Sequence, residues 1–173
     1  EPEEAIFLAE EYGRAIGEQA RIIGLNWVLA PVCDINTNSQ NPVINMRAWG
    51  EEPEIVSKLA CAFNKGLLAM GVLTCAKHFP GHGDTHLDSH LSLPVVDHDF
   101  SRLDQKELLP FKALIEKGVN SVMTAHLLIK NVDSKFPATL SKKIVSNLLR
   151  KKLGFQGLIV TDALVMKAIS SKY

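Results

Sequence analysis

Four short apolar runs, each separated from the next by a helical pattern, constrain the fold of this chain more than any other feature. The runs cover residues 27–30, 72–76, 119–124 and 158–161. They are continuously apolar rather than alternating, as expected when both faces of a strand are buried in a parallel sheet. Each interval has room for a helix and its loops, so the sequence predicts a repeated βα unit.

The first helix is expected over residues 2–23, where apolar side chains recur at steps of three or four. This spacing predicts one buried stripe on the helix. Its members are Ile6, Ala9, Tyr12, Ile16, Ala20 and Ile23.

Further helices are expected over residues 53–70, 101–118 and 141–153, and from about residue 163. Ser101 resembles the first residue of a capping box at the start of the helix expected over residues 101–118, the third helical pattern of the chain. Pro110 lies inside the same pattern and lacks the N–H that a helix interior needs. We expect it to kink this helix or to split it in two.

The composition is that of an ordinary globular protein and excludes several classes. Of 173 residues, 46% are hydrophobic, and 19 basic residues balance 19 acidic ones. A neutral chain offers no general attraction for nucleic acid or an anionic membrane. No apolar run approaches the roughly 18 residues that cross a bilayer. Three cysteines without a CxxC motif argue against a disulfide framework, which favours a reducing, cytoplasmic location.

No linker divides the chain, which we expect to be one domain or part of one. A doubly wound parallel sheet and half of a (β/α)8 barrel both fit the pattern. Complete barrels typically reach about 250 residues, so this chain would be a partial barrel of about four βα units. It starts without a methionine inside one helical pattern and stops inside another. We therefore expect a domain truncated at both ends.

Reactive side chains follow all four expected strands. Asp34 comes after the first, Lys77 and His78 after the second, His126 after the third and Asp162 after the fourth. The carboxyl ends of strands form the ligand face of α/β folds, so the joint pattern predicts one shared site. Any one of these residues alone would equally suit a loop start or a helix cap.

Five of the six histidines lie between His78 and His98. Imidazole is a common metal ligand, but Pro80, Gly81 and Gly83 break any helix that would align these rings. A glycine-containing mobile loop that carries a proton-transfer group is the preferred interpretation, and we expect neither metal nor cofactor.

Asp88 lies two residues before His90, close enough to fix the tautomer of its ring and raise its pKa. A histidine held in this way can both donate and accept a proton near neutral pH. Asp162 ends a buried strand at the expected start of a helix, whose positive end would keep the carboxylate ionised and nucleophilic. Arg47 stands beside Trp49 in a long loop and suits the binding of adjacent hydroxyls. These features predict an α/β hydrolase or lyase of a neutral polar substrate.

The sequence from Lys77 to His90 resembles the K-H-F-P-G-H-G-x(4)-D-S/T-H signature of glycoside hydrolase family 3, in its β-N-acetylglucosaminidase branch. Residues 30–36 resemble the A-P-V-x-D segment of that family. Arg47 matches its R-[SA]-[FW] position, and the Ala125-His126 pair and residues 160–164 match two further segments in order. The resemblance covers nearly the whole chain and implies a TIM-like barrel and a retaining glycosidase.

The resemblance implies a role for each matched residue. Asp162 would be the nucleophile, His90 the acid/base and Asp88 the residue that orients His90. The side chains implied to bind sugar hydroxyls are Arg47, Lys77 and His78. The implied substrate is a terminal β-linked N-acetylglucosamine, most plausibly on a cell-wall muropeptide. We expect the full-length protein to be a monomer that acts on carbohydrate and binds neither nucleic acid nor membrane.

The sequence also fits three competing functions. A β-glucosidase of the same family would take its acid/base glutamate from a second domain, and the Asp88-Ser89-His90 sequence argues against it. A metal-dependent hydrolase would use the histidine-rich loop, and a non-catalytic relative would bind sugar without turning it over. The D-Q-E-G-G segment of the family does not occur in this chain. We expect the isolated chain, with unpaired sheet edges, to be inactive and poorly soluble.

Overall fold

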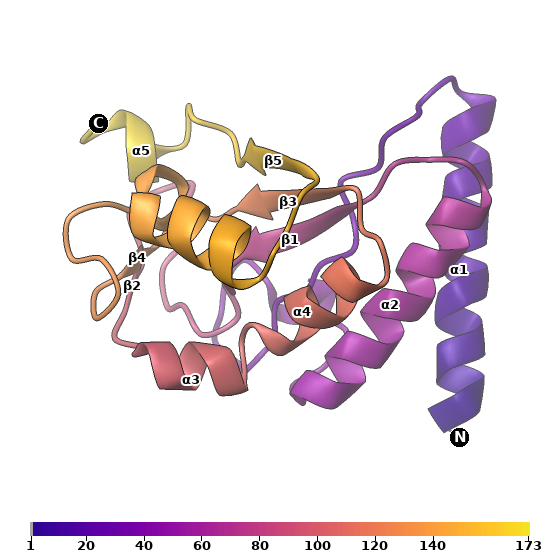
Figure 1. The fold of residues 1–173 in the computed structure, drawn as a ribbon, viewed down its shortest axis with the longest axis horizontal. Helices are drawn as coiled ribbons and strands as arrows, with labels where there is room; N and C mark the ends of the chain where they lie inside the picture. The colour runs from indigo at the N-terminus through magenta and orange to yellow at the C-terminus, as the bar shows by residue number, and fades with distance from the viewer. Residues whose placement is uncertain (1) are drawn as a thin grey trace.

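A computed structural model describes residues 2–173, and its centre is a parallel sheet (Figure 1). Strands β1 (Cys75–Phe79), β3 (Ser121–Thr124) and β5 (Leu158–Thr161) lie in the order β1-β3-β5. The register pairs Phe79 with Thr124 and Thr124 with Thr161. The three carboxyl ends therefore lie together at one edge of the sheet, as the predicted βα repeat requires.

The first expected strand, residues 27–30, is interrupted rather than regular. This segment and the residues after it form two isolated parallel bridges with the chain around β1, Trp27 with Leu73 and Val32 with Lys77, and the N–H of Cys75 donates to the carbonyl of Ala30 at 2.8 Å. Pro31 has no N–H to donate to a neighbour, and the N–H of Ala30 turns back to the carbonyl of Val28. The segment still runs beside β1, and so it delivers the residues that follow it to the same edge.

Strand β1 starts and ends three residues later than expected, since the prediction was 72–76 and the strand is Cys75–Phe79. Lys77 and His78 therefore lie within the strand, and the prediction that they follow it is wrong. The cause is continued pairing, because the N–H of Ala125 donates to the carbonyl of Phe79 at 2.8 Å. Partner strands, rather than side-chain polarity, decide where this strand ends.

Helices α1 (Pro2–Ile22) and α2 (Pro53–Ala69) pack side by side (Figure 1), and the expected stripe is confirmed only in part, since Ala9 and Ala20 are buried. Tyr12 and Ile23 are exposed, whereas Gly13 and Gly66 lie in the contact. A Cβ atom on Gly13 would overlap the carbonyl of Phe63, and one on Gly66 would overlap that of Glu10. The backbones cross too closely for large side chains, which instead lie beside the crossing.

The third helical pattern is divided in two as predicted, into α3 (Phe100–Gln105) and α4 (Leu109–Glu116), with Pro110 in the first turn of α4. Its cap is Asp99 rather than Ser101, because the Asp99 carboxylate accepts the N–H of Arg102 at 2.8 Å. The fourth helical pattern forms a π-helix, η3 (Lys143–Lys152), and α5 (Lys167–Ser170) starts later than expected. Short elements complete the chain: η1 (Asn45–Arg47), β2 (Val95–Val96), β4 (Leu128–Ile129) and η2 (Ala138–Leu140).

The main core fills the space between the sheet and the helices that cover it. The rings of Phe79 on β1 and Phe111 on α4 meet edge to face at 5.2 Å between centroids. Leu114 and Leu149 add fully buried side chains from α4 and η3. Burial of these apolar side chains stabilises the core and so holds the strand ends in fixed positions, which a catalytic site needs. Within residues 2–173, no helix is both long and apolar enough to span a bilayer.

Candidate active site

A cavity of about 170 Å³ lies at the carboxyl edge of the sheet and brings five of the six predicted site residues together. These five come from four separate segments of the chain: Arg47, Lys77 with His78, His90 and Asp162. The sixth, Asp88, is bonded to His90. The other lining residues are the polar His82 and Ser89 and the apolar Leu29, Val43 and Met123.

Asp162 is positioned by backbone contacts directly after β5. Its N–H donates to the carbonyl of Thr124 at 3.2 Å, and its carboxylate accepts the N–H of Ala163 at 2.8 Å. The expectation that it lies at the start of a helix is wrong, because a turn closed by the Met166 N–H on the Ala163 carbonyl precedes α5. The sheet and this turn, rather than a helix end, hold the carboxylate toward the cavity.

Asp88 and His90 form the predicted pair. One carboxylate oxygen, Oδ1 of Asp88, accepts the backbone N–H of His90 at 2.8 Å and lies 2.7 Å from its ring Nδ1. Partial burial of Asp88 opposes its ionisation, but these hydrogen bonds from His90 lower the pKa of the carboxyl overall. An ionised carboxylate can only accept, so Nδ1 carries a proton and Nε2 remains free for another partner.

The loop that carries this pair is attached to the segment after Asp162. The N–H groups of Lys167 and Ala168, in the first turn of α5, donate to the carbonyls of His90 and Ser89 at 3.2 and 3.3 Å. The Ser89 hydroxyl also lies 3.1 Å from Nε2 of His82. Together these contacts hold the His90 segment close to the segment that carries Asp162.

A second aspartate–histidine pair, Asp34 and His78, holds part of the cavity wall in place. Asp34 is fully buried, and its Oδ2 lies 2.7 Å from Nδ1 of His78. Asp34 also accepts the backbone N–H groups of His78 and His82, the latter at 2.7 Å. Burial raises the pKa of Asp34, but the interactions with His78 and His82 outweigh this and lower it. Asp34 therefore orients His78 from behind, a role that sequence reasoning did not assign although it noted the residue.

His82 is the second residue of the site whose role sequence reasoning missed. Burial lowers the pKa of its ring, and His78 adds to this effect while Asp34 opposes it. A neutral imidazole has one donor and one acceptor nitrogen, and here they face the hydroxyls of Thr85 and Ser89 at 2.8 and 3.1 Å. The P-G-H-G sequence of the loop was the available signal.

Two cations form one wall of the cavity. Burial lowers the pKa of the Lys77 ammonium, and the nearby Arg47 lowers it further, whereas Asp162 acts in the opposite direction. Arg47 is held by a bond from its Nη1 to the carbonyl of Val43 at 3.0 Å. The carboxylate of Asp162 thus faces positive charge across a small polar space.

His126 does not line the cavity, contrary to the expectation of one shared site. Its ring bonds the Thr139 hydroxyl at 2.8 Å and the carbonyl of Ala163 at 3.1 Å. It therefore holds the neighbour of Asp162 in place. In the described part of the chain, no three His, Cys, Asp or Glu side chains are arranged to hold a metal ion.

A parallel α/β sheet whose carboxyl edge carries an aspartate, an aspartate–histidine pair and sugar-sized polar space has the architecture of a barrel-type glycoside hydrolase. The family model described as "Glycosyl hydrolase family 3 N terminal domain" matches residues 2–173, and the chain belongs to this family.

Individual proteins agree with this assignment. The chain is 44% identical to "Beta-hexosaminidase A" of Pseudoalteromonas piscicida, over 98% of its own length and 30% of that protein. It is 46% identical to a solved glycoside hydrolase family 3 β-N-acetylglucosaminidase from Paenibacillus sp. str. FPU-7, with a TM-score of 0.93 over 100% of this chain and 32% of the other.

A solved structure described as "Beta-glucoside phosphorylase BglX" is 32% identical, with a TM-score of 0.94 over 99% of this chain and 33% of the other. The chain therefore spans about a third of the length of these relatives. The likeness supports the partial TIM-like barrel that the sequence predicted.

Proposed function

We propose that the protein is a retaining glycosidase that hydrolyses terminal β-linked N-acetylglucosamine. The observation that carries this proposal is that Asp162 and His90 line the same cavity while Asp88 orients the ring of His90. The names of the relatives from Pseudoalteromonas and Paenibacillus support the choice of sugar.

In the first step, a carboxylate oxygen of Asp162 attacks the anomeric carbon of the sugar. The bond to the leaving oxygen breaks, and this oxygen takes the proton of His90 Nε2. The product is a covalent glycosyl ester on Asp162. Asp88 holds the Nδ1 proton throughout and stabilises the imidazolium form of His90 from which the proton leaves.

In the second step, the neutral Nε2 of His90 takes a proton from water. The water oxygen attacks the anomeric carbon, and the ester bond to Asp162 breaks, so that the carboxylate and the imidazolium are both restored. Most retaining glycosidases use a second carboxylate for this task. A histidine performs it without a second bare anion near Asp162.

Arg47, Lys77 and His78 are proposed to bind the sugar hydroxyls, since all three line the cavity. His78 turns its Nδ1 toward Asp34, which leaves Nε2 for the substrate. We also propose cell-wall muropeptides as the source of the sugar. A cytoplasmic location is a further proposal, and the three unpaired cysteines support it.

The test compares 4-nitrophenyl N-acetyl-β-D-glucosaminide with the matching β-glucoside, using the complete protein. The expected result is selective hydrolysis of the former, with kcat reduced at least about 10³-fold in Asp162→Ala and about 10²–10⁴-fold in His90→Ala. His86→Ala is the matched control, because His86 is an exposed histidine of the same loop that contacts Asn38 instead of the cavity.

Two further measurements sharpen the test. Azide should restore turnover to Asp162→Ala by replacing the missing nucleophile, and the glycosyl azide is the expected product. Inorganic phosphate should leave the rate unchanged; a phosphate-dependent rate with release of a sugar phosphate would instead favour the phosphorylase reaction named for one relative. A preference for the glucoside would overturn the choice of substrate.

A further inference from the structure

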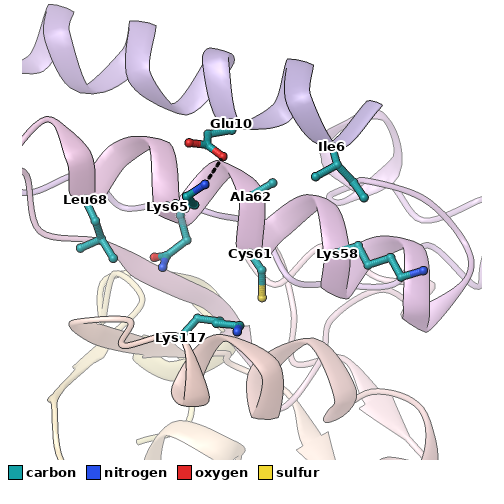
Figure 2. Close-up of a pocket in the computed structure, with 9 residues that line it drawn as sticks. Ile6, Glu10, Lys58, Cys61, Ala62, Lys65, Leu68 and Lys117 are labelled. Atoms are coloured by element: carbon teal, nitrogen blue, oxygen red, sulfur yellow. Dashed lines mark hydrogen bonds and ion pairs between the residues drawn. The ribbon is translucent and has the colours of Figure 1, made fainter. Parts of the chain in front are cut away.

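A second and larger cavity lies away from the carboxyl edge of the sheet, among helices α1, α2 and α4. Its volume is about 470 Å³, a size typical of sites for small molecules. Figure 2 shows that Ile6 and Glu10 reach it from α1, Lys117 from the end of α4, and Cys61 from α2, pointing toward Lys117. Nothing in the proposed reaction uses this space.

The charge in this cavity is unbalanced. Glu10 is already occupied, because its two carboxylate oxygens accept Arg14 at 2.9 Å and Lys65 at 2.7 Å. The bond from Lys65 is the main reason that the pKa of Glu10 is lowered. Lys58 and Lys117 also line the cavity, and neither has an ion-pair partner among residues 2–173. Two ammonium groups are therefore free to bind an anion.

Asn64 provides an independent indication of a ligand. Its side chain lines the cavity and is 1% exposed, yet neither its amide nitrogen nor its amide oxygen has a hydrogen-bond partner. Buried polar groups are almost always bonded, because leaving them unpaired is costly. A bound molecule with an amide of its own would supply both a donor and an acceptor to Asn64.

The remaining wall is apolar. Ile6, Ala62 and Leu68 form much of it (Figure 2), and they suit a branched hydrocarbon side chain. We propose that this cavity binds an N-acylated amino acid: its carboxylate at Lys117, its amide at Asn64, and its side chain against the apolar wall. The inference does not depend on the proposed glycosidase activity.

Binding is tested on the complete protein with N-acetyl-L-leucine as the probe. A molecule of this size is expected to bind with a Kd of about 1 mM or below. N-acetyl-L-leucinamide, which lacks the carboxylate, and inorganic phosphate, which lacks the apolar part, should each bind at least about tenfold more weakly. Equal binding of either control would overturn the proposal.

Cys61 gives a direct readout of occupancy. It is the half-buried thiol in this cavity, whereas Cys33 and Cys75 are fully buried elsewhere. Burial raises the pKa of the Cys61 thiol, so the alkylation is run with iodoacetamide at about pH 9 and followed by peptide mass spectrometry. Saturating N-acetyl-L-leucine should slow this reaction at least about threefold. A Cys61 that is alkylated equally fast with and without the probe contradicts the proposal.

Three variants assign the contacts. Lys117→Gln should raise Kd about three- to tenfold. Lys58→Gln should raise it less, because the Lys58 side chain is turned away from Lys117 (Figure 2), and Lys151→Gln, on the exposed side of η3, should leave it unchanged. Asn64→Leu should raise Kd and also raise the Tm of the free protein by about 2–5 °C, because an unpaired buried amide is removed. Unchanged affinity in Asn64→Leu would overturn the role of Asn64.

Discussion

Two aspartate–histidine pairs in this molecule share the same contact, 2.7 Å between a carboxylate oxygen and Nδ1, but lie in opposite surroundings. In the Asp34–His78 pair the side chains are 0% and 6% exposed; in the Asp88–His90 pair they are 30% and 61% exposed. The buried pair joins His78 on β1 to Asp34, which lies 44 residues earlier in the chain, whereas both residues of the exposed pair belong to one loop. The difference separates a pair that maintains the site from a pair that can exchange protons with a substrate.

The largest expected effect is on stability, in Asp34→Ala. This change leaves the His78 ring and two buried N–H groups without their acceptor. Loss of one partner of a buried pair typically costs about 3–5 kcal/mol. Urea denaturation measures this loss in the free energy of unfolding. The matched control is Asp88→Ala, because loss of the exposed pair should cost under about 1 kcal/mol. Equal losses in the two variants would remove the distinction between the pairs.

The second effect is on activity, in Asp88→Asn. An asparagine has a similar shape but cannot stabilise the imidazolium form of His90, so kcat should fall about 10²-fold. KM should change little, because Asp88 does not line the cavity. A loss of kcat under about threefold would mean that Asp88 only packs the loop.

The third expected effect is a difference in acid sensitivity. The folded-state pKa of Asp34 is lowered below its ordinary 3.8, so its contribution to stability is complete above that value and is lost as the pH falls through the lowered pKa. The stability difference between wild type and Asp34→Asn should therefore be constant from pH 5 to 7 and shrink below about pH 4.

The same denaturation series in Asp88→Asn is the control for the pH effect. Asp88 also has a lowered pKa, but solvent screens its partly exposed carboxylate. The free energy of unfolding of Asp88→Asn should therefore depend on pH in nearly the same way as that of the wild type. A pH-independent difference for Asp34→Asn would show that Asp34 titrates alike in the folded and unfolded chains.

The smallest effect is expected in Ser89→Ala. The Ser89 hydroxyl joins the loop of the exposed pair to His82, which lies next to the buried pair. Loss of one neutral hydrogen bond costs about 1 kcal/mol, so a loosened His90 should lower kcat about threefold to fivefold. Ser89→Thr keeps the hydroxyl and should restore the rate; failure to do so would point to packing at Ser89.

The elements that could be predicted from the sequence are those fixed by local pattern. Strand 158–161 matches β5, and the division of the third helical pattern follows from Pro110, which is tolerated in the first turn of a helix but not in its interior. The predicted Asp88–His90 pair also formed, because two residues of separation bring these side chains within reach of each other.

The errors lie where distant partners decide the outcome. The end of β1 depends on Ala125, and the α1–α2 contact depends on the Gly13 and Gly66 backbones rather than on the size of the apolar residues. Asp34 appears beside His78 only when two segments more than 40 residues apart are brought together. The spacing of residues within one segment does not predict which distant segment will lie beside it.

The link between α5 and the His90 loop has a consequence for anyone who maps this protein by alanine scanning. The donors are the main-chain N–H groups of Lys167 and Ala168, which every residue except proline retains. A library of side-chain replacements would pass over these two positions as tolerant, and only a proline scan would reveal them. Apparent neutrality at Lys167 or Ala168 is therefore no evidence that this stretch is dispensable.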